Sequence, residues 1–172
     1  MWGQRMNNFI KAIDFTLPWE TGKDKFGHIR QDGGYNNHPD DPGGETKWGI
    51  SKRAYPNLDI KNLSLGQAFL IYKEDYYDKY KSYKPPLDLD SVPMDYAICV
   101  FDTGVNCGVG RTFKWHRMSE KEKDPTMALL GLRQEHYASL PTFHKFGKGW
   151  MNRLNDLRKY VEVVRADTAS RS

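Results

Sequence analysis

The sequence has 172 residues, a length that suits one domain and can bury about two-thirds of the unfolded surface without disulfides or metals. No apolar run approaches the roughly 20 residues of a membrane span, so stable membrane insertion is not expected. The net charge of +4 is uneven, because residues 1–109 carry 13 basic and 15 acidic groups whereas residues 110–172 carry 13 basic and 7 acidic groups, which suggests a polyanionic partner.

The N-terminal segment predicts an amphipathic helix over residues 7–17. Its apolar residues recur at helical spacing: Phe9, Ile10, Ile13 and Leu17. Asn7 or Asn8 can cap its start, and Pro18 predicts a kink or an early stop. Glu20 is therefore expected at or just beyond the end of the first helix.

Residues 21–50 are rich in turn chemistry, with TG, GG and DDPGG. The short strand candidates are GHIR and KWGIS, so we predict a small β element of two or three strands with irregular loops. The pattern DGGYNNHPDD superficially resembles a calcium loop, but it lacks the spaced acids and the terminal glutamate of an EF-hand. The five histidines show no ligand spacing. We therefore predict no metal and no cofactor.

Helices dominate the rest of the sequence. Ser64 and Gln67 form a capping box ahead of an aromatic stripe, which predicts a helix within 63–80. Residues 84–93 are interpreted as a linker. Three further helices are expected, at 93–108, at about 110–118 and after an Asp124 cap with Pro125 at its first position. The last helix, at about 148–165, has one apolar face: Trp150, Leu154, Leu157, Val161 and Val164. The predicted fold class is mainly α (α+β), a helical body with a small β-hairpin element after the first helix.

The two cysteines, Cys99 and Cys107, form no metal-binding or CxxC pattern. They are interpreted as two small buried thiols, in keeping with a reducing compartment. Residues 1–15 lack the continuous apolar segment and the small-residue cleavage site of a signal peptide. We therefore expect the protein to be made and folded in a reducing cytoplasm.

Some of the acidic residues suit glycoside cleavage. That reaction needs a proton donor for the leaving oxygen, together with a carboxylate or a held water on the other face of the sugar. Glu20 follows a proline and a tryptophan, and apolar surroundings favour the protonated form of a carboxyl group. DDPGGET offers Asp40 and Asp41 as the second carboxylate, and Thr46 could help to hold a water.

This stretch resembles the catalytic region of glycoside hydrolase family 108, the phage and bacterial muramidases of the lysozyme superfamily. Their pattern is a helix ending in Glu, followed by GGYxNDPxDPGGxTxxGIS. The matching residues are Glu20 and GGYNNHPDDPGGETKWGIS at 33–51. The C-terminal half is similar too, because FDTGVNCGVGR at 101–111 resembles FDxxVNxGxxR and FGKGWMNRLNDL at 146–157 resembles FxxGWxNRxxxL. The resemblance covers nearly the whole chain.

One departure leaves two alignments open. In the family pattern the glutamate stands directly before GGY, but here Asp32 occupies that position and Glu20 lies twelve residues upstream. Either residues 21–32 are an insertion after the catalytic Glu20, or Asp32 has replaced the glutamate. We prefer the insertion, because FIKAIDFTLPWE matches the first helix of the family and an aspartate reaches less far.

The resemblance implies hydrolysis of the β-1,4 bond between N-acetylmuramic acid and N-acetylglucosamine. In that reaction Glu20 is the general acid, Asp41 stabilises positive charge or positions water, and Thr46 assists. The candidates for substrate binding are Tyr35, Trp48, Asp102 and Asn106. Each has a structural alternative: the aromatic residues can be core residues, Asp41 a turn residue, Thr46 a plain strand residue, and the Asp102–Asn106 pair part of a helix cap or a buried polar network.

The resemblance also implies one lysozyme-like domain over 1–172, with a catalytic region at 1–85 and a helical, peptidoglycan-binding region at 93–172. The expected partner is bacterial peptidoglycan rather than nucleic acid, and the protein is expected to be a monomer. We expect a phage endolysin that stays in the host cytoplasm until its release and then acts on the wall from the periplasm. Two alternatives stay open: a lytic transglycosylase, which would use Glu20 without a strict need for Asp41, and a non-catalytic wall- or nucleic-acid-binding module.

Overall fold

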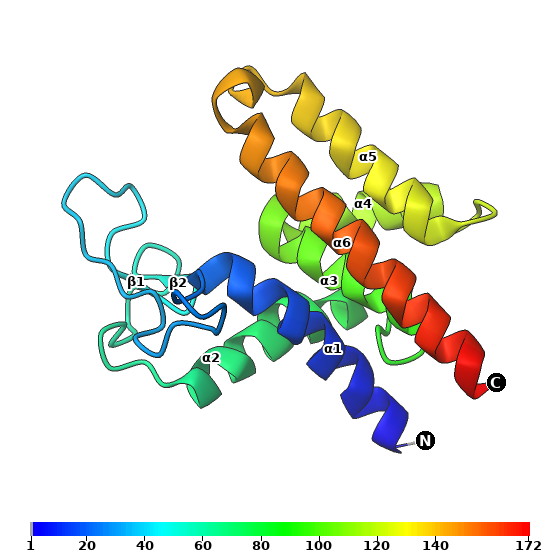
Figure 1. Cartoon of the computed structure of the whole chain (residues 1–172), viewed down its shortest axis with the longest axis horizontal. Helices are drawn as coiled ribbons and strands as arrows, with labels where there is room; N and C mark the ends of the chain where they lie inside the picture. The colour runs from blue at the N-terminus through cyan, green and yellow to red at the C-terminus, as the bar shows by residue number, and fades with distance from the viewer. Residues whose placement is uncertain (1) are drawn as a thin grey trace. The chain divides into compact units, whose positions relative to one another are not determined.

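The structure, a computed structural model, describes residues 2–172, with side chains from residue 8 onward. The chain forms two compact units, one made of the residues up to Phe15 together with Tyr76–Ser172, the other of Thr16–Asp75. These bounds differ from the regions 1–85 and 93–172, whose functional division stays a prediction. The described residues form six α-helices and one two-stranded antiparallel sheet, so the predicted fold class is confirmed (Figure 1). No helix in this part of the chain is long and apolar enough to cross a membrane.

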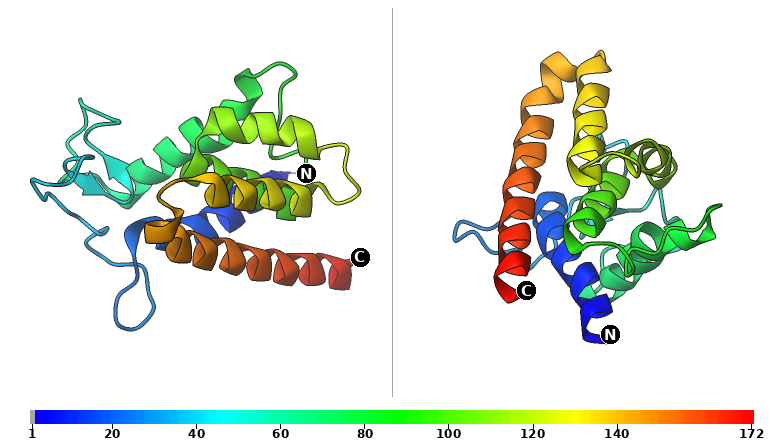
Figure 2. Two further views of the ribbon diagram at one scale, coloured as in Figure 1. Left: turned by 90° about the horizontal axis from the view of Figure 1, so that it is seen from above. Right: turned by 90° about the vertical axis from the view of Figure 1, so that its right-hand side faces the viewer.

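The larger unit is built around helix α3 (Met94–Cys107), which contacts α4 (Val109–Ser119), α5 (Pro125–Ser139) and α6 (Phe143–Arg171). Figures 1 and 2 show α5 and α6 side by side and antiparallel. Helix α6 extends beyond both ends of the last helix predicted at 148–165. Four members of its predicted apolar face are buried: Leu154, Leu157, Val161 and Val164.

Helix α1 (Trp2–Thr21) begins earlier than predicted. The predicted cap at Asn8 is wrong, since this residue lies inside the helix and its buried side chain donates to the carbonyl oxygens of Leu89 (2.9 Å) and Val92 (3.2 Å). The Asn7 side chain lies outside the described residues. Pro18 does not stop the helix, which continues to Thr21.

In the smaller unit, β1 (Thr46–Lys47) pairs antiparallel with β2 (Ile50–Ser51). Trp48 and Gly49 connect them with φ values of +55° and +76°, the two positive values that a type I′ hairpin turn requires. The strand predicted for KWGIS is therefore a turn between two short strands. The strand predicted for GHIR is reduced to a single bridge between Lys23 and Ile29. A further isolated bridge joins Asn36, the residue after GGY, to Thr46 of β1.

The predicted helix at 63–80 consists of three consecutive helical pieces: α2 (Leu65–Tyr72), a π-helical turn (Lys73–Tyr77) and a 3₁₀ turn (Asp78–Ser82). The Ser64–Gln67 capping box is present at its start. Both cysteines are free thiols, with Cys99 buried and Cys107 half-buried, and burial raises the pKa of each thiol.

Candidate active site

Glu20 lies in the last turn of α1, where the helix C-terminus is built by local hydrogen bonds. The Thr21 hydroxyl donates to the Leu17 carbonyl oxygen at 3.0 Å, and the Gly22 N–H donates to the Pro18 carbonyl oxygen at 3.0 Å. Gly22 has a φ of +76°, which is the left-handed conformation that commonly ends helices. The carboxylate of Glu20 is therefore carried by a regular helix end rather than by a loose loop.

The hairpin turn packs directly against Glu20. A β-carbon added to Gly49 would lie 2.8 Å from Cβ of Glu20, 3.3 Å from its Oε2 and 2.3 Å from the Tyr72 hydroxyl. The same hydroxyl donates to the Trp48 carbonyl oxygen at 2.8 Å and so fixes the turn. Only glycine fits between the helix end and α2, and Glu20 is half-buried there.

The GGY segment also lies beside the end of α1. A β-carbon at Gly34 would lie 2.4 Å from the Thr21 carbonyl oxygen, so the backbone of residue 34 touches the backbone of residue 21. Residues 22–30 leave and return as a closed hairpin, whose ends are joined by a hydrogen bond from the Arg30 N–H to the Gly22 carbonyl oxygen (3.5 Å). In space, therefore, Glu20 stands next to GGY even though twelve residues separate it from Gly33 in sequence.

Asp32 has a different environment. Its side chain accepts two hydrogen bonds from the Arg30 guanidinium, at 3.0 and 2.6 Å, and one from the Gly34 N–H at 3.0 Å. These bonds, that from Arg30 above all, lower the pKa of the Asp32 carboxyl. An exposed carboxylate held in its ionised form is poorly suited to donate a proton at neutral pH.

Asp41 lies at the open end of the hairpin. Its Oδ1 accepts the Gly43 N–H at 2.8 Å, and its Oδ2 accepts from the Asn36 side chain at 3.4 Å. The turn role that the sequence left open is therefore present, and it also fixes the direction of the carboxylate. The side chain of Asp40, by contrast, is 90% exposed and 3.7 Å from the His38 ring.

Thr46 shares the open end of the hairpin with Asp41. A β-carbon added to Gly43 would lie 3.2 Å from Asp41 Oδ1 and 3.8 Å from Thr46 Cγ2, so the two side chains border the same space. Main-chain hydrogen bonds in both directions hold Thr46 to Asn36, at 2.8 and 3.0 Å. Glu20 of α1 therefore packs against the turn of the hairpin, and Asp41 and Thr46 lie at the open end of the hairpin.

The two aromatic candidates differ in burial. Trp48 is buried, its indole N–H donates to the Leu63 carbonyl oxygen at 3.0 Å, and its ring covers Gly33. Tyr35 is half-buried, and its hydroxyl donates to Glu45 at 2.7 Å. That hydrogen bond raises the pKa of the Tyr35 hydroxyl. Tyr35 therefore keeps some solvent exposure, whereas Trp48 forms part of the core.

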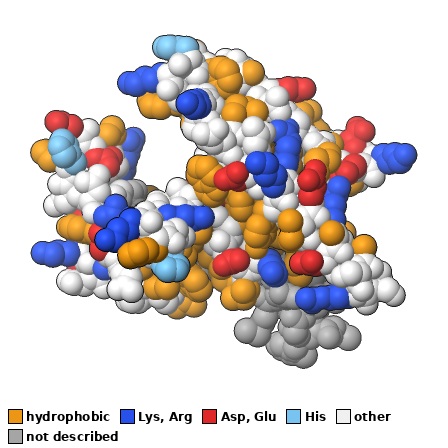
Figure 3. Space-filling view, viewed as in Figure 1, with side chains coloured by type: hydrophobic (Ala, Val, Ile, Leu, Met, Phe, Trp, Pro, Cys, Tyr) orange, Lys and Arg blue, Asp and Glu red, His pale blue; other side chains and the backbone are white. Residues whose placement is uncertain are grey.

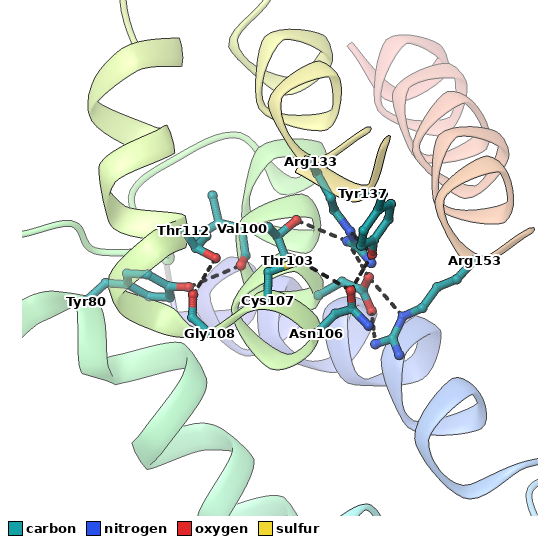
Figure 4. Close-up of polar contacts among 11 residues, drawn as sticks. Tyr80, Val100, Thr103, Asn106, Cys107, Gly108, Thr112, Arg133, Tyr137 and Arg153 are labelled. Carbon is teal, nitrogen blue, oxygen red and sulfur yellow. Dashed lines mark hydrogen bonds and ion pairs between the residues drawn. The ribbon is translucent and has the colours of Figure 1, made fainter. Parts of the chain in front are cut away.

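Asp102 and Asn106, from the larger unit, belong to a buried polar network (Figure 4). The fully buried Asp102 carboxylate binds Arg133 Nη1 at 2.8 Å and Arg153 Nη2 at 2.8 Å. Burial alone would raise the pKa of Asp102, but the charges of Arg153 and Arg133 outweigh it and hold the pKa at about 2. Arg133 Nε donates to the Tyr137 hydroxyl at 2.7 Å, and that hydroxyl donates to the side-chain oxygen of Asn106. The structural alternative given for Asp102 and Asn106, a buried polar network, is therefore the one that the structure contains.

Residues 28–108 match the family model of glycosyl hydrolase 108. This segment is a glycosyl hydrolase 108 region, so the predicted family is confirmed. The matched segment contains Asp32, Asp41 and Thr46 and begins eight residues after Glu20. The family match supports a glycosidase that hydrolyses peptidoglycan.

The solved structure of Brucella abortus SagA is similar to this protein, with a TM-score of 0.70 and 24% sequence identity over 95% of this chain and 99% of SagA. At this identity the likeness shows a shared fold. No curated protein matches the sequence.

Several residues that shape the site were not found by sequence reasoning. Gly49 and Tyr72 position Glu20, and Gly34 lets the GGY segment reach the helix end. The glycines were visible as turn residues, but nothing in the sequence showed which side chain each would meet. Arg153 was visible as the arginine of the FGKGWMNRLNDL motif, and Arg133 only as a member of a basic C-terminal third; neither pattern indicated a shared partner in Asp102.

Proposed function

We propose that this protein is a muramidase, which hydrolyses the β-1,4 bond between N-acetylmuramic acid and N-acetylglucosamine in bacterial peptidoglycan. In the proposed reaction the Glu20 carboxyl group donates its proton to the glycosidic oxygen as the bond from that oxygen to the sugar carbon breaks. Asp41 stabilises the positive charge on that sugar or positions the water that attacks it, and Thr46 assists. The reaction uses no cofactor.

The observation that supports this assignment most directly is the return of GGY to the end of α1. Residues 22–30 form their own hairpin and Gly34 touches the Thr21 backbone, so removing the excursion would leave Glu20 directly beside GGY as in the family pattern. Asp32 is not an equivalent proton donor, because the Arg30 guanidinium binds its carboxylate. We therefore treat residues 21–32 as an insertion and Glu20 as the acid.

Substrate contacts are proposed for Tyr35, which is only half-buried. Trp48 and Asp102 are buried, and we assign them structural roles in this proposal. Asn106 is half-buried, and its side-chain oxygen is occupied by the Tyr137 hydroxyl. Any contact of Asn106 with a sugar would have to use its amide nitrogen.

We further propose that the protein acts as a monomeric phage endolysin, held in the host cytoplasm before lysis and active on the wall after release. Its basic C-terminal third suits a wall polymer that carries carboxylates. The exposed aromatic surface on α6 fits the same partner, because Phe146 is 46% exposed and packs beside Trp150 at a centroid distance of 5.9 Å.

The test is the chemical nature of the products. Purified peptidoglycan is digested with the protein, and the released fragments are identified by mass spectrometry. The proposal predicts fragments that end in reducing N-acetylmuramic acid. Anhydro-muramic ends would identify a lytic transglycosylase instead, reducing N-acetylglucosamine ends a different glycosidase, and binding without release a non-catalytic wall-binding module.

A further inference from the structure

The insertion that follows Glu20 is an ordered hairpin with an apolar tip. Lys23 and Ile29 form an antiparallel bridge, and the Asp24 N–H donates to the His28 carbonyl oxygen at 2.7 Å. At the tip, Phe26 is 73% exposed, the largest exposed fraction among the large apolar side chains that the structure describes. A single exposed apolar side chain is common in proteins, so the case for a ligand contact depends on how this ring is held and on the side chains beside it.

The tip is fixed by the carboxylate of Asp24. Its Oδ1 accepts the N–H groups of Phe26 (2.8 Å) and His28 (3.0 Å), and Gly27 takes the left-handed backbone with a φ of +84°. The hydrogen bond from His28 is the main reason that the pKa of Asp24 is lowered, so the carboxylate stays ionised and keeps both bonds at neutral pH. The Phe26 ring is therefore presented from a preorganised turn, which lowers the entropy lost when a ligand binds.

A lysine and a histidine lie beside this ring. Lys25 Nζ lies 5.1 Å from the centroid of Phe26, and the His28 ring lies 6.5 Å from it. Among the described side chains no carboxylate is within ion-pair distance of Lys23 or Lys25, whereas Arg30 is bound to Asp32. Figure 3 shows basic side chains gathered beside a hydrophobic side chain and a histidine over this loop.

The first residue of the hairpin is hydrogen-bonded to the helix turn that carries Glu20. This residue, Gly22, donates its N–H to Pro18 in that turn. Phe26 lies four residues beyond Gly22, so their α-carbons cannot be more than about 14 Å apart. A polymer chain that places one bond at Glu20 can therefore reach the tip with a neighbouring unit.

We propose that the hairpin 22–30 is a subsite for the peptidoglycan strand beside the bond that is cleaved. The Phe26 ring stacks on the apolar face of a sugar, and Lys23 and Lys25 bind carboxylates of the lactyl group or the attached peptide. The occupant is a carboxylate-bearing glycan, because a neutral sugar polymer would leave the two lysines without a partner. This inference rests on the proposed function, since it takes the substrate to be peptidoglycan.

The test compares Phe26→Ala with Phe26→Trp, which keeps an aromatic face, and with Leu70→Ala, which removes another exposed apolar side chain of the same unit (62% exposed). Binding to insoluble peptidoglycan is measured by co-sedimentation, and hydrolysis by release of reducing ends. We expect Phe26→Ala to weaken binding and raise KM roughly 3- to 10-fold with kcat unchanged, because a contact made equally in ground and transition state is lost. Phe26→Trp and Leu70→Ala should behave like the wild type.

Lys25→Gln should weaken the binding and reduce its salt dependence. Thermal unfolding of all variants should match the wild type, since each replaced side chain is exposed. Unchanged co-sedimentation of Phe26→Ala overturns the subsite, whether or not the wild type cleaves. So does Phe26-dependent binding to phosphatidylglycerol vesicles without such binding to peptidoglycan, which would show a membrane contact. A wild type that binds through Phe26 but releases no reducing ends would contradict the proposed hydrolysis and leave the binding site standing.

Discussion

The two adjacent aspartates of DDPGG differ in how firmly they are held. Asp41 is fixed by the Gly43 N–H and by Asn36, whereas Asp40 points into solvent. We predict that Asp41→Asn lowers peptidoglycan hydrolysis by roughly 10²-fold, the scale of losing one preorganised electrostatic contact in a transition state. Asp40→Asn should have little effect in the same reducing-end assay. Equal small losses in two normally melting variants would reduce Asp41 to a turn residue and favour a transglycosylase.

Asp102 is the shared anion of two buried arginines, Arg133 and Arg153. Its replacement by asparagine keeps the shape but leaves buried positive charge without its partner, which costs about 3–5 kcal/mol of unfolding free energy. Urea unfolding at neutral pH measures this loss. A variant of normal stability whose KM alone rises would contradict the structural role and restore Asp102 as a substrate ligand.

The same carboxylate makes a pH-dependent contribution. Its pKa is about 2 in the folded protein and about 3.9 in an unfolded chain, so its ionised form favours folding. The contribution is fully present above about pH 4 and is lost as the pH falls towards 2, and its size is roughly 2–3 kcal/mol. Unfolding free energies of the wild type should therefore fall more steeply than those of Asp102→Asn between pH 4 and 2. Parallel curves would contradict the lowered pKa.

At the scale of elements, the hairpin turn is what holds Glu20 in place. Gly49→Ala should destabilise the protein and reduce hydrolysis, because the new methyl group would overlap the Tyr72 hydroxyl and Glu20. Gly44→Ala is the matched control: it shares a positive φ (+68°), but its nearest neighbour, Lys52 Cβ, is 4.0 Å away. Both should pay the left-handed backbone penalty of about 1–2 kcal/mol, and only Gly49→Ala should also lose activity beyond its loss of stability. Equal activity in the two variants would show that the turn does not position the acid.

Elements with local signals were predictable from the sequence. The Ser64–Gln67 capping box starts α2, and Asp124 caps α5 with Pro125 at its first position. The turn in KWGIS was missed because tryptophan rarely adopts a positive φ. Here burial of the Trp48 indole and its hydrogen bond to Leu63 hold that conformation, and these tertiary contacts leave no local sequence signature.

For the whole molecule, the charge asymmetry of the sequence has a structural counterpart on α6. Its apolar face is buried, while Lys145, Lys148 and Lys159 are exposed and Arg158 is half-exposed. Changing these four residues to Gln should weaken binding to insoluble peptidoglycan and reduce its salt dependence, while cleavage of a short soluble oligosaccharide stays near that of the wild type. Collapse of both activities in a folded variant would place this surface in the active site.

The residue types of the site were predictable from the sequence, but the identity of the acid was not. Two candidates, Glu20 and Asp32, precede GGY at different distances, and linear spacing does not reveal that residues 22–30 form a closed hairpin. Two contacts distinguish the candidates: Gly34 of GGY touches Thr21, the residue after Glu20, and Asp32 is paired with Arg30. The Asp102–Asn106 spacing likewise fitted a ligand site and a buried network equally well until their arginine and tyrosine partners were located.

The most direct test of the account is to compare Glu20→Gln with Asp32→Asn in peptidoglycan hydrolysis, each variant first shown to melt like the wild type. Glutamine keeps the shape of the side chain and removes its titratable proton. Loss of general acid catalysis should therefore lower the rate roughly 10²- to 10⁴-fold in Glu20→Gln, whereas Asp32→Asn should retain most of its activity. A rate that collapses in Asp32→Asn and survives in Glu20→Gln would show that Asp32 has replaced the family glutamate and that Glu20 is not the acid.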